Sequence, residues 1–172
     1  MRKLGIALLL ACAAALPAAA QTKISGTESC AKPDPSYSVD VGDAGHALIL
    51  QKTACTWNTQ MVIEGSKATG SVDVSTTDMR GMKGMINGYA TVTLDSGDKF
   101  LVRYGGPAMA SKDGSATYTG KWTFISGTGK LKGIKGGGTY KGAGKADGSS
   151  TADIEGEYTM TAAASKAPAK SQ

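Results

Sequence analysis

Hydrophobic and polar residues alternate with a period of two along most of the chain between residues 37 and 160. This is the period of a β-strand, in which successive side chains point to opposite faces. The clearest runs are residues 89–94, 99–104 and 117–124, and each has one polar face. Asp95-Ser96-Gly97-Asp98, between the first two runs, is typical of a tight hairpin turn. We find no convincing amphipathic helix in the sequence.

The pattern predicts eight or nine short strands at regular spacing, which indicates an antiparallel barrel or sandwich. We favour a closed barrel, because closure removes the unpaired edges that an exported protein must otherwise protect. The 24 glycines among 172 residues argue against helices and fit the coiled strands of a small barrel. We therefore predict an all-β fold, a single antiparallel β-barrel of about eight strands over residues 21–162. Residues 163–172 are predicted to be a disordered tail.

Residues 1–20 have the features of a cleaved secretory signal peptide. A basic start precedes an apolar stretch that is shorter than the roughly 20 residues needed to span a bilayer. Ala18-Ala19-Ala20 then supplies the small residues of an A-x-A cleavage site. We expect cleavage before Gln21 and a periplasmic or secreted product with no transmembrane segment. The alternative is lipoprotein processing at Cys12.

The positive charge of the chain is modest once the signal peptide is removed. Cleavage takes away two positive charges and no negative one, so the net charge falls from +5 to +3. Nucleic acid is not an expected partner of an exported protein with few exposed aromatic residues. One region is nevertheless basic, and it could bind an anionic component of the envelope, such as a glycan or lipid, or be an ordinary solvated face. Its lysines are Lys121, Lys130, Lys132, Lys135, Lys141 and Lys145.

Cys30 and Cys55 form an even pair in an oxidising compartment once Cys12 has been removed. We predict a disulfide between them. Closing a loop of about 25 residues stabilises a protein by roughly 3 kcal/mol in the chain-entropy model. The spacing is unlike the C-x-x-C motif of redox-active pairs, so the expected role is structural.

The glycine-rich segment 125–145 does not have the spacing of a phosphate-binding loop. No window in it matches the Walker A motif, and Lys132 stands where a G-x-G-x-x-G motif beginning at Gly127 needs its last glycine. No helical pattern follows that could orient a phosphate. The sequence therefore predicts no nucleotide site, and we expect no cofactor.

The same segment instead resembles part of the allene-oxide-cyclase-like and dirigent-like barrels. The match covers about 25 residues, through the strand of residues 118–124 and then Gly127-Thr128-Gly129-Lys130-Leu131, Gly133-Ile134-Lys135-Gly136 and Gly138-Thr139-Tyr140. The resemblance implies a barrel in which Leu131 and Ile134 plug one end. It also implies an isomerase or cyclase as an alternative function, although it carries over no catalytic residue.

Several aromatic residues fall on the expected inner face of the barrel. The interior of a small barrel is either filled by side chains or left open as a ligand cavity. Aromatic side chains with polar tips suit a small apolar or phenolic ligand, so we predict a non-enzymatic binding module. The only histidine, His46, gives little support for an enzyme. The expected ligand-binding residues are Tyr104, Tyr118, Trp122, Tyr140 and Tyr158.

Met79, Met82 and Met85 form an M-x-x-M-x-x-M row. Soft thioether sulfurs select Cu(I), so the row is a possible copper site. Arg80 and Lys83 lie within it and repel a cation. We therefore predict no metal site and expect these methionines to pack adaptably over the barrel mouth.

Overall fold

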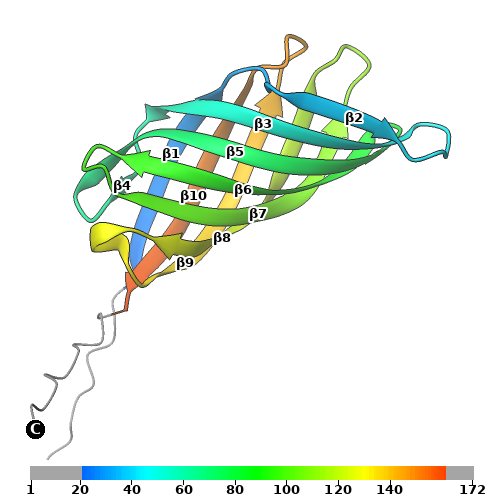
Figure 1. The fold of residues 1–172 in the computed structure, drawn as a ribbon. Coiled ribbons are helices and arrows are strands. Elements are labelled where there is room, and N and C mark those ends of the chain that lie inside the picture. Colours follow the sequence, from blue (N-terminus) through cyan, green and yellow to red (C-terminus); the bar gives the residue numbers. More distant parts are fainter. Residues whose placement is uncertain (1–20, 162–172) are drawn as a thin grey trace, which may run out of the picture.

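The computed structural model describes residues 21–161, which form a closed antiparallel barrel of eight strands (Figure 1). The predicted fold class is therefore confirmed. The expected signal peptide and the expected tail lie outside the described residues. Within residues 21–161 no helix is long and apolar enough to cross a membrane.

The barrel strands run β1, β10, β9, β8, β7, β6, β5 and β3 around the wall, and β3 pairs with β1 to close it. Their bounds are β1 Thr22–Cys30, β3 His46–Thr59, β5 Ser66–Arg80, β6 Lys83–Leu94, β7 Lys99–Ala110, β8 Ala116–Gly127, β9 Ile134–Gly144 and β10 Ser150–Met160. Two short strands flank the barrel: β2 (Ser36–Asp40) extends the edge of β3, and β4 (Val62–Ile63) pairs with β5. A single 3-10 turn, η1 (Gly129–Leu131), joins β8 to β9 in the described chain.

The seam between β1 and β3 is the shortest contact between neighbouring barrel strands. Four residue pairs join the two strands, with a bulge between Thr27 and Glu28. The neighbouring contact between β3 and β5 has an uninterrupted register from His46 to Thr56. Cys30 and Cys55 face each other at one end of the short seam and are joined by a disulfide. The predicted disulfide is therefore confirmed, and it links the strands that close the barrel.

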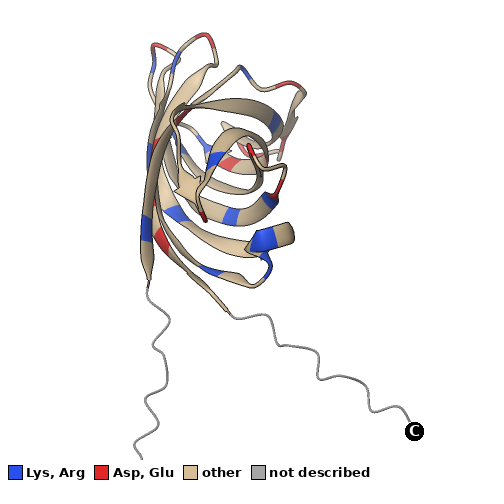
Figure 2. Ribbon diagram, turned by 90° about the vertical axis from the view of Figure 1, so that its left-hand side faces the viewer, with Lys and Arg blue, Asp and Glu red and all other residues tan. Residues whose placement is uncertain are grey.

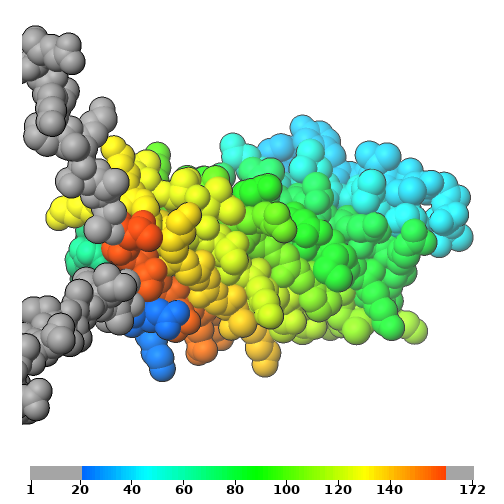
Figure 3. All heavy atoms as spheres, turned by 90° about the horizontal axis from the view of Figure 1, so that it is seen from below, coloured from blue at the N-terminus to red at the C-terminus, as the bar shows by residue number. Residues whose placement is uncertain are grey.

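One end of the barrel is sealed by a hydrophobic core. η1 and the start of β9 bring Leu131 and Ile134 to this end, and Ile63 of β4 also lies in the core. All three side chains are almost completely buried. Leu131 and Ile134 thus occupy the place expected of a plug. The start of β1 and the end of β10 lie at this end, whereas β2 and the turn after it lie at the other (Figure 3).

The polar face of β5 points into the barrel. Val72 and Val74 are 42% and 45% exposed on the outer wall, and the residues between and beside them, Ser71 and Asp73, face the interior. A filled hydrophobic barrel would have the opposite arrangement. The interior of this barrel is therefore partly polar.

Candidate functional site

The barrel encloses a cavity of about 380 Å³ that is lined by residues from all eight barrel strands. This volume lies in the range of small-molecule sites, which are mostly apolar with a few polar groups. Met61 and Phe100, near the sealed end, lie at its inner limit. At the opposite end its lining includes Met79, Ala108 and the exposed Lys145. The lumen is thus open space rather than a completely filled core.

Four of the five expected ligand-binding residues line this cavity: Tyr104, Tyr118, Trp122 and Tyr140. Tyr104 and Tyr140 meet edge to face, with ring centroids 5.7 Å apart. The fifth residue, Tyr158, packs in the core near the sealed end, where its hydroxyl donates a hydrogen bond to Glu64 Oε1 at 2.9 Å. Tyr158 does not line the cavity. A binding role for the other four stays a prediction.

Glycines on the neighbouring strands make room for these large side chains. A Cβ atom at Gly88 would lie 2.7 Å from the Tyr104 hydroxyl oxygen, and one at Gly120 would lie 2.6 Å from the ring of Tyr140. A methyl group at either position would force the ring to move, since real contacts of a Cβ atom are longer. Similar pairs are Trp57 over Gly26, Tyr118 over Gly142 and Trp122 over Gly156. The inner-face glycines therefore position the aromatic wall.

Two carboxyl groups face the same lumen: Glu28 of β1 and Asp73 of β5. Glu28 is 8% exposed, and its Oε2 accepts a hydrogen bond from the Ser71 hydroxyl at 3.1 Å. Burial, and then the charge of Asp73, raises the pKa of Glu28 from 4.5 to about 8, against an opposing effect of Ser71. Burial also raises the pKa of Asp73 from 3.8 to about 6, although hydrogen bonds with Tyr104 and Ser71 oppose the rise. Burial therefore favours the protonated form of both carboxyl groups.

Three polar atoms of the cavity lining are buried without a hydrogen-bond partner in the described chain. They are Trp57 Nε1, Asp73 Oδ1 and the Tyr140 hydroxyl. A buried polar group without a partner costs free energy, so such groups call for an explanation. Together they offer a hydrogen-bond donor, an acceptor and a group that can act as either.

Neither Glu28 nor Asp73 stands out in the sequence as a candidate site residue. Asp73 belongs to the row Ser71-Val72-Asp73-Val74-Ser75, in which the outward face is the apolar one. A row of polar residues on one face of a barrel strand, opposite an apolar outward face, indicates a polar lumen. Glu28 is an isolated acid in a short strand, and only the closure of β1 onto β3 brings it to the cavity.

His46 lies outside the cavity. Its Nε2 lies 2.8 Å from Asp78 Oδ1 and its Nδ1 lies 3.8 Å from Asp43 Oδ2. These partners sit at the turn before β3 and at the end of β5. His46 is therefore not brought to the acidic pair.

The methionine row is not brought together at one point. Met79 lines the cavity near its mouth, whereas Met85 is 50% exposed on the outer wall of β6. Met82 lies in the turn between β5 and β6 and is 40% exposed. Met79 and Met85 thus lie on opposite faces of the hairpin, and the absence of a copper site stays a prediction.

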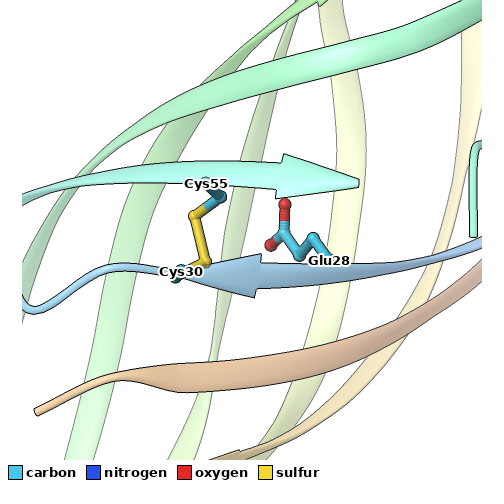
Figure 4. A group of neighbouring side chains, drawn as sticks. All are labelled: Glu28, Cys30 and Cys55. Carbon is cyan, nitrogen blue, oxygen red and sulfur yellow. A yellow bond between two sulfur atoms is a disulfide. The ribbon is translucent and has the colours of Figure 1, made fainter. Parts of the chain in front are cut away.

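The carboxylate of Glu28 also lies within 4.8 Å of the sulfurs of Cys30 and Cys55 (Figure 4). Glutamate and cysteine side chains can bind zinc when the cysteines are thiolates. Here both sulfurs are engaged in the disulfide. The group therefore offers one carboxylate and no thiolate.

All six lysines of the predicted basic region are exposed. Lys121 and Lys141 lie on the outer wall of β8 and β9, and Lys141 pairs directly with Asp153 of β10. Basic positions are spread over several strands and turns (Figure 2). The lysines line the outside of the barrel, apart from Lys145 at the cavity mouth.

No protein-family model matches this chain. No curated protein matches it either.

Proposed function

We propose that this protein is a non-enzymatic binding module that takes a small apolar or phenolic ligand into the barrel lumen. The observation that carries the proposal is the 380 Å³ cavity, which one hydrophobic plug seals at one end and aromatic side chains line along its length. Concave, largely apolar sites with a few convergent polar groups are the usual sites of small ligands. The expected contacts are the rings of Tyr104, Tyr118, Trp122 and Tyr140.

The proposal also holds that the protein works outside the cytoplasm, in the periplasm or as a secreted protein. The Cys30–Cys55 disulfide supports this location, because such bonds persist in oxidising compartments. The signal-peptide pattern of residues 1–20 supports it independently.

Binding can be tested with 4-ethylphenol, a small phenol with an apolar tail. Both tryptophans of the chain, Trp57 and Trp122, line the cavity, so their fluorescence reports on its occupancy. We expect a saturable fluorescence change and an increase in melting temperature. The substitution Tyr118→Ala should weaken binding at least tenfold. Tyr89→Ala is the matched control, because Tyr89 is 50% exposed on the outer wall.

Two results would contradict a binding module of this class. One is the absence of any saturable change with 4-ethylphenol or with close analogues that carry a polar or charged tail. The other is an equal effect of Tyr118→Ala and Tyr89→Ala on binding, with both variants folded. The second result would move the binding site away from the lumen.

A second candidate function, an isomerase or cyclase of the allene-oxide-cyclase type, is favoured by the acidic pair. Two neighbouring buried carboxyl groups whose pKa values are both raised by burial can serve as general acid and general base. The test is cyclisation of a fatty-acid allene oxide by the wild-type protein and by Glu28→Gln. Turnover that is lost in this folded variant would favour the enzyme, and no turnover above the uncatalysed rate would exclude this reaction.

A further inference from the structure

We propose that the ligand of the lumen is an organic cation, a protonated amine attached to an apolar or aromatic body, and that its ammonium group binds between Glu28 and Asp73. This inference rests on the proposed binding function and names the chemical class of its ligand. It concerns the polar middle of the cavity, where β1 and β5 bring the two carboxyl groups to one space.

The acidic pair has no counter-charge of its own. None of the three ion pairs in the described chain involves Glu28 or Asp73. The cavity lining contains one basic residue, Lys145, which is exposed in the turn between β9 and β10. A buried carboxylate without a cation is costly, and a bound ammonium group would remove that cost. The charge of the lumen thus fits a cation and disfavours an anion.

The unpartnered atoms of the lining are an independent sign of a polar ligand. Trp57 is only 9% exposed, its side chain lines the cavity, and its Nε1 has no hydrogen-bond partner in the described chain. Asp73 Oδ1 and the Tyr140 hydroxyl share this property. An ammonium group supplies N–H donors to the carboxylate oxygen. A hydroxyl or other acceptor on the same ligand would take the indole N–H.

The walls of the cavity favour an organic cation over a metal ion. Ca²⁺ takes six to eight oxygen ligands, and Mg²⁺ demands octahedral geometry. This lining offers two carboxyl groups among mostly apolar and aromatic side chains. Aromatic rings attract ammonium groups through cation–π interactions and also pack against an apolar body. Trp57, Tyr104 and Tyr140 are among the aromatic residues of the lining that could make both contacts.

The experiment compares three probes that share one phenol ring and differ in the charge of the tail: tyramine (cation), tyrosol (neutral) and 4-hydroxyphenylacetate (anion). Binding to the chain that begins at Gln21 is measured at pH 8 by tryptophan fluorescence and by calorimetry. We expect tyramine to bind at least tenfold more tightly than tyrosol, and 4-hydroxyphenylacetate to bind most weakly. Asp73→Asn should reduce the affinity for tyramine to that for tyrosol. Glu155→Gln, which removes an exposed carboxylate of the outer wall, should change neither.

The pH dependence of binding by the wild-type protein gives a second test that needs no variant. Tyramine should bind more weakly at pH 5, where both carboxyl groups carry protons, than at pH 8, and tyrosol should bind equally at both. The other titratable groups that face the pair are the hydroxyls of Tyr104, Tyr118 and Tyr140, with Lys145 at the mouth. Burial raises the pKa of all three tyrosines above the ordinary value, so their hydroxyls keep their protons at both pH values.

The outcomes separate this inference from the function on which it rests. If tyrosol binds as tightly as tyramine at pH 8, the preference for a cation is wrong and the binding module stands. The preference for a cation is also wrong if tyramine binds folded Asp73→Asn as tightly as wild type and its affinity does not depend on pH. If none of the three probes and no 4-ethylphenol binds to the wild-type protein, the binding function itself is overturned.

Discussion

At the scale of single residues, the buried position of Glu28 has a direct consequence for stability. Its pKa is about 8 in the folded protein, against 4.5 as a reference for the unfolded chain. Between these values the folded state keeps a proton that the unfolded state has lost. The free energy of unfolding therefore has its full contribution from this group below about pH 4.5 and loses it as the pH rises toward 8.

We predict that Glu28→Gln reduces this loss of stability. Wild-type protein should be less stable at pH 8 than at pH 5, by on the order of a few kcal/mol, and the variant should show a smaller difference. The measurement is urea denaturation at the two pH values without ligand. Glu155→Gln is the control, because Glu155 is exposed and should keep the wild-type pH dependence. Equal pH dependence in wild type and Glu28→Gln would show that Glu28 does not retain its proton on folding.

The pairing of aromatic rings with glycines also belongs to this scale. Several large rings of the lining lie against strand positions that have no side chain, as Tyr118 does over Gly142. A larger residue there would push the ring toward the centre of the barrel. The glycines thus determine the shape of the cavity as well as the curvature of the wall.

At the scale of strands, the seam between β1 and β3 is the weakest part of the barrel wall. It has four residue pairs and a bulge, and the Cys30–Cys55 disulfide reinforces it. We predict that the double substitution Cys30→Ser/Cys55→Ser lowers the free energy of unfolding by roughly 3 kcal/mol. Amide hydrogen exchange should accelerate most in residues 27–30 and 55–59, and least in the paired centre of β5.

The measurement is hydrogen exchange by mass spectrometry on wild type and on the double variant under native conditions. The β6–β7 hairpin serves as the internal control, because its long register does not involve the disulfide. Uniform acceleration over the whole barrel would mean that the seam does not open separately, and that the disulfide acts only on global unfolding.

Strand alternation predicts much of this fold, and its failures are informative. The prediction is correct for the hairpin of residues 89–104 and for the strand that carries Trp122, because one face of each strand is apolar and buried. On β5 the same rule puts Val72 inside, yet this residue is outside. Alternation identifies two faces, but it cannot say which one is inside when the interior is partly polar. The disulfide between the two cysteines could be predicted from their number and the expected oxidising compartment alone.

The candidate site was harder to predict than the fold. Most of its aromatic residues follow from strand alternation, because their rings occupy the inner face as a filled core would. Glu28 and Asp73 are 45 positions apart in sequence and reach one space only through the closure of the barrel. No local pattern encodes that contact. Tyr158 was expected to line the ligand site. It does lie on the inner face, but it packs in the hydrophobic core at the level of the plug.

At the scale of the whole molecule, the barrel has one sealed end and one end through which a ligand can enter. Leu131 and Ile134 close the end where the described chain starts and finishes. The cavity continues toward the opposite end, where its lining includes Met79, Ala108 and the exposed Lys145. Entry at that end requires no opening of the hydrophobic core.

We predict that a large side chain at the mouth blocks the lumen without unfolding the barrel. Ala108 of β7 lines the cavity there, and Met109 beside it is 48% exposed on the outer wall. Ala108→Phe should weaken binding of 4-ethylphenol at least tenfold, since the ring occupies the path to the aromatic wall, with a melting temperature that stays within a few degrees of wild type. Met109→Phe adds the same ring one position away on the outside, and it should leave binding unchanged. Fluorescence titration of both variants measures the difference. If folded Ala108→Phe binds as wild type does, the ligand does not enter by this mouth.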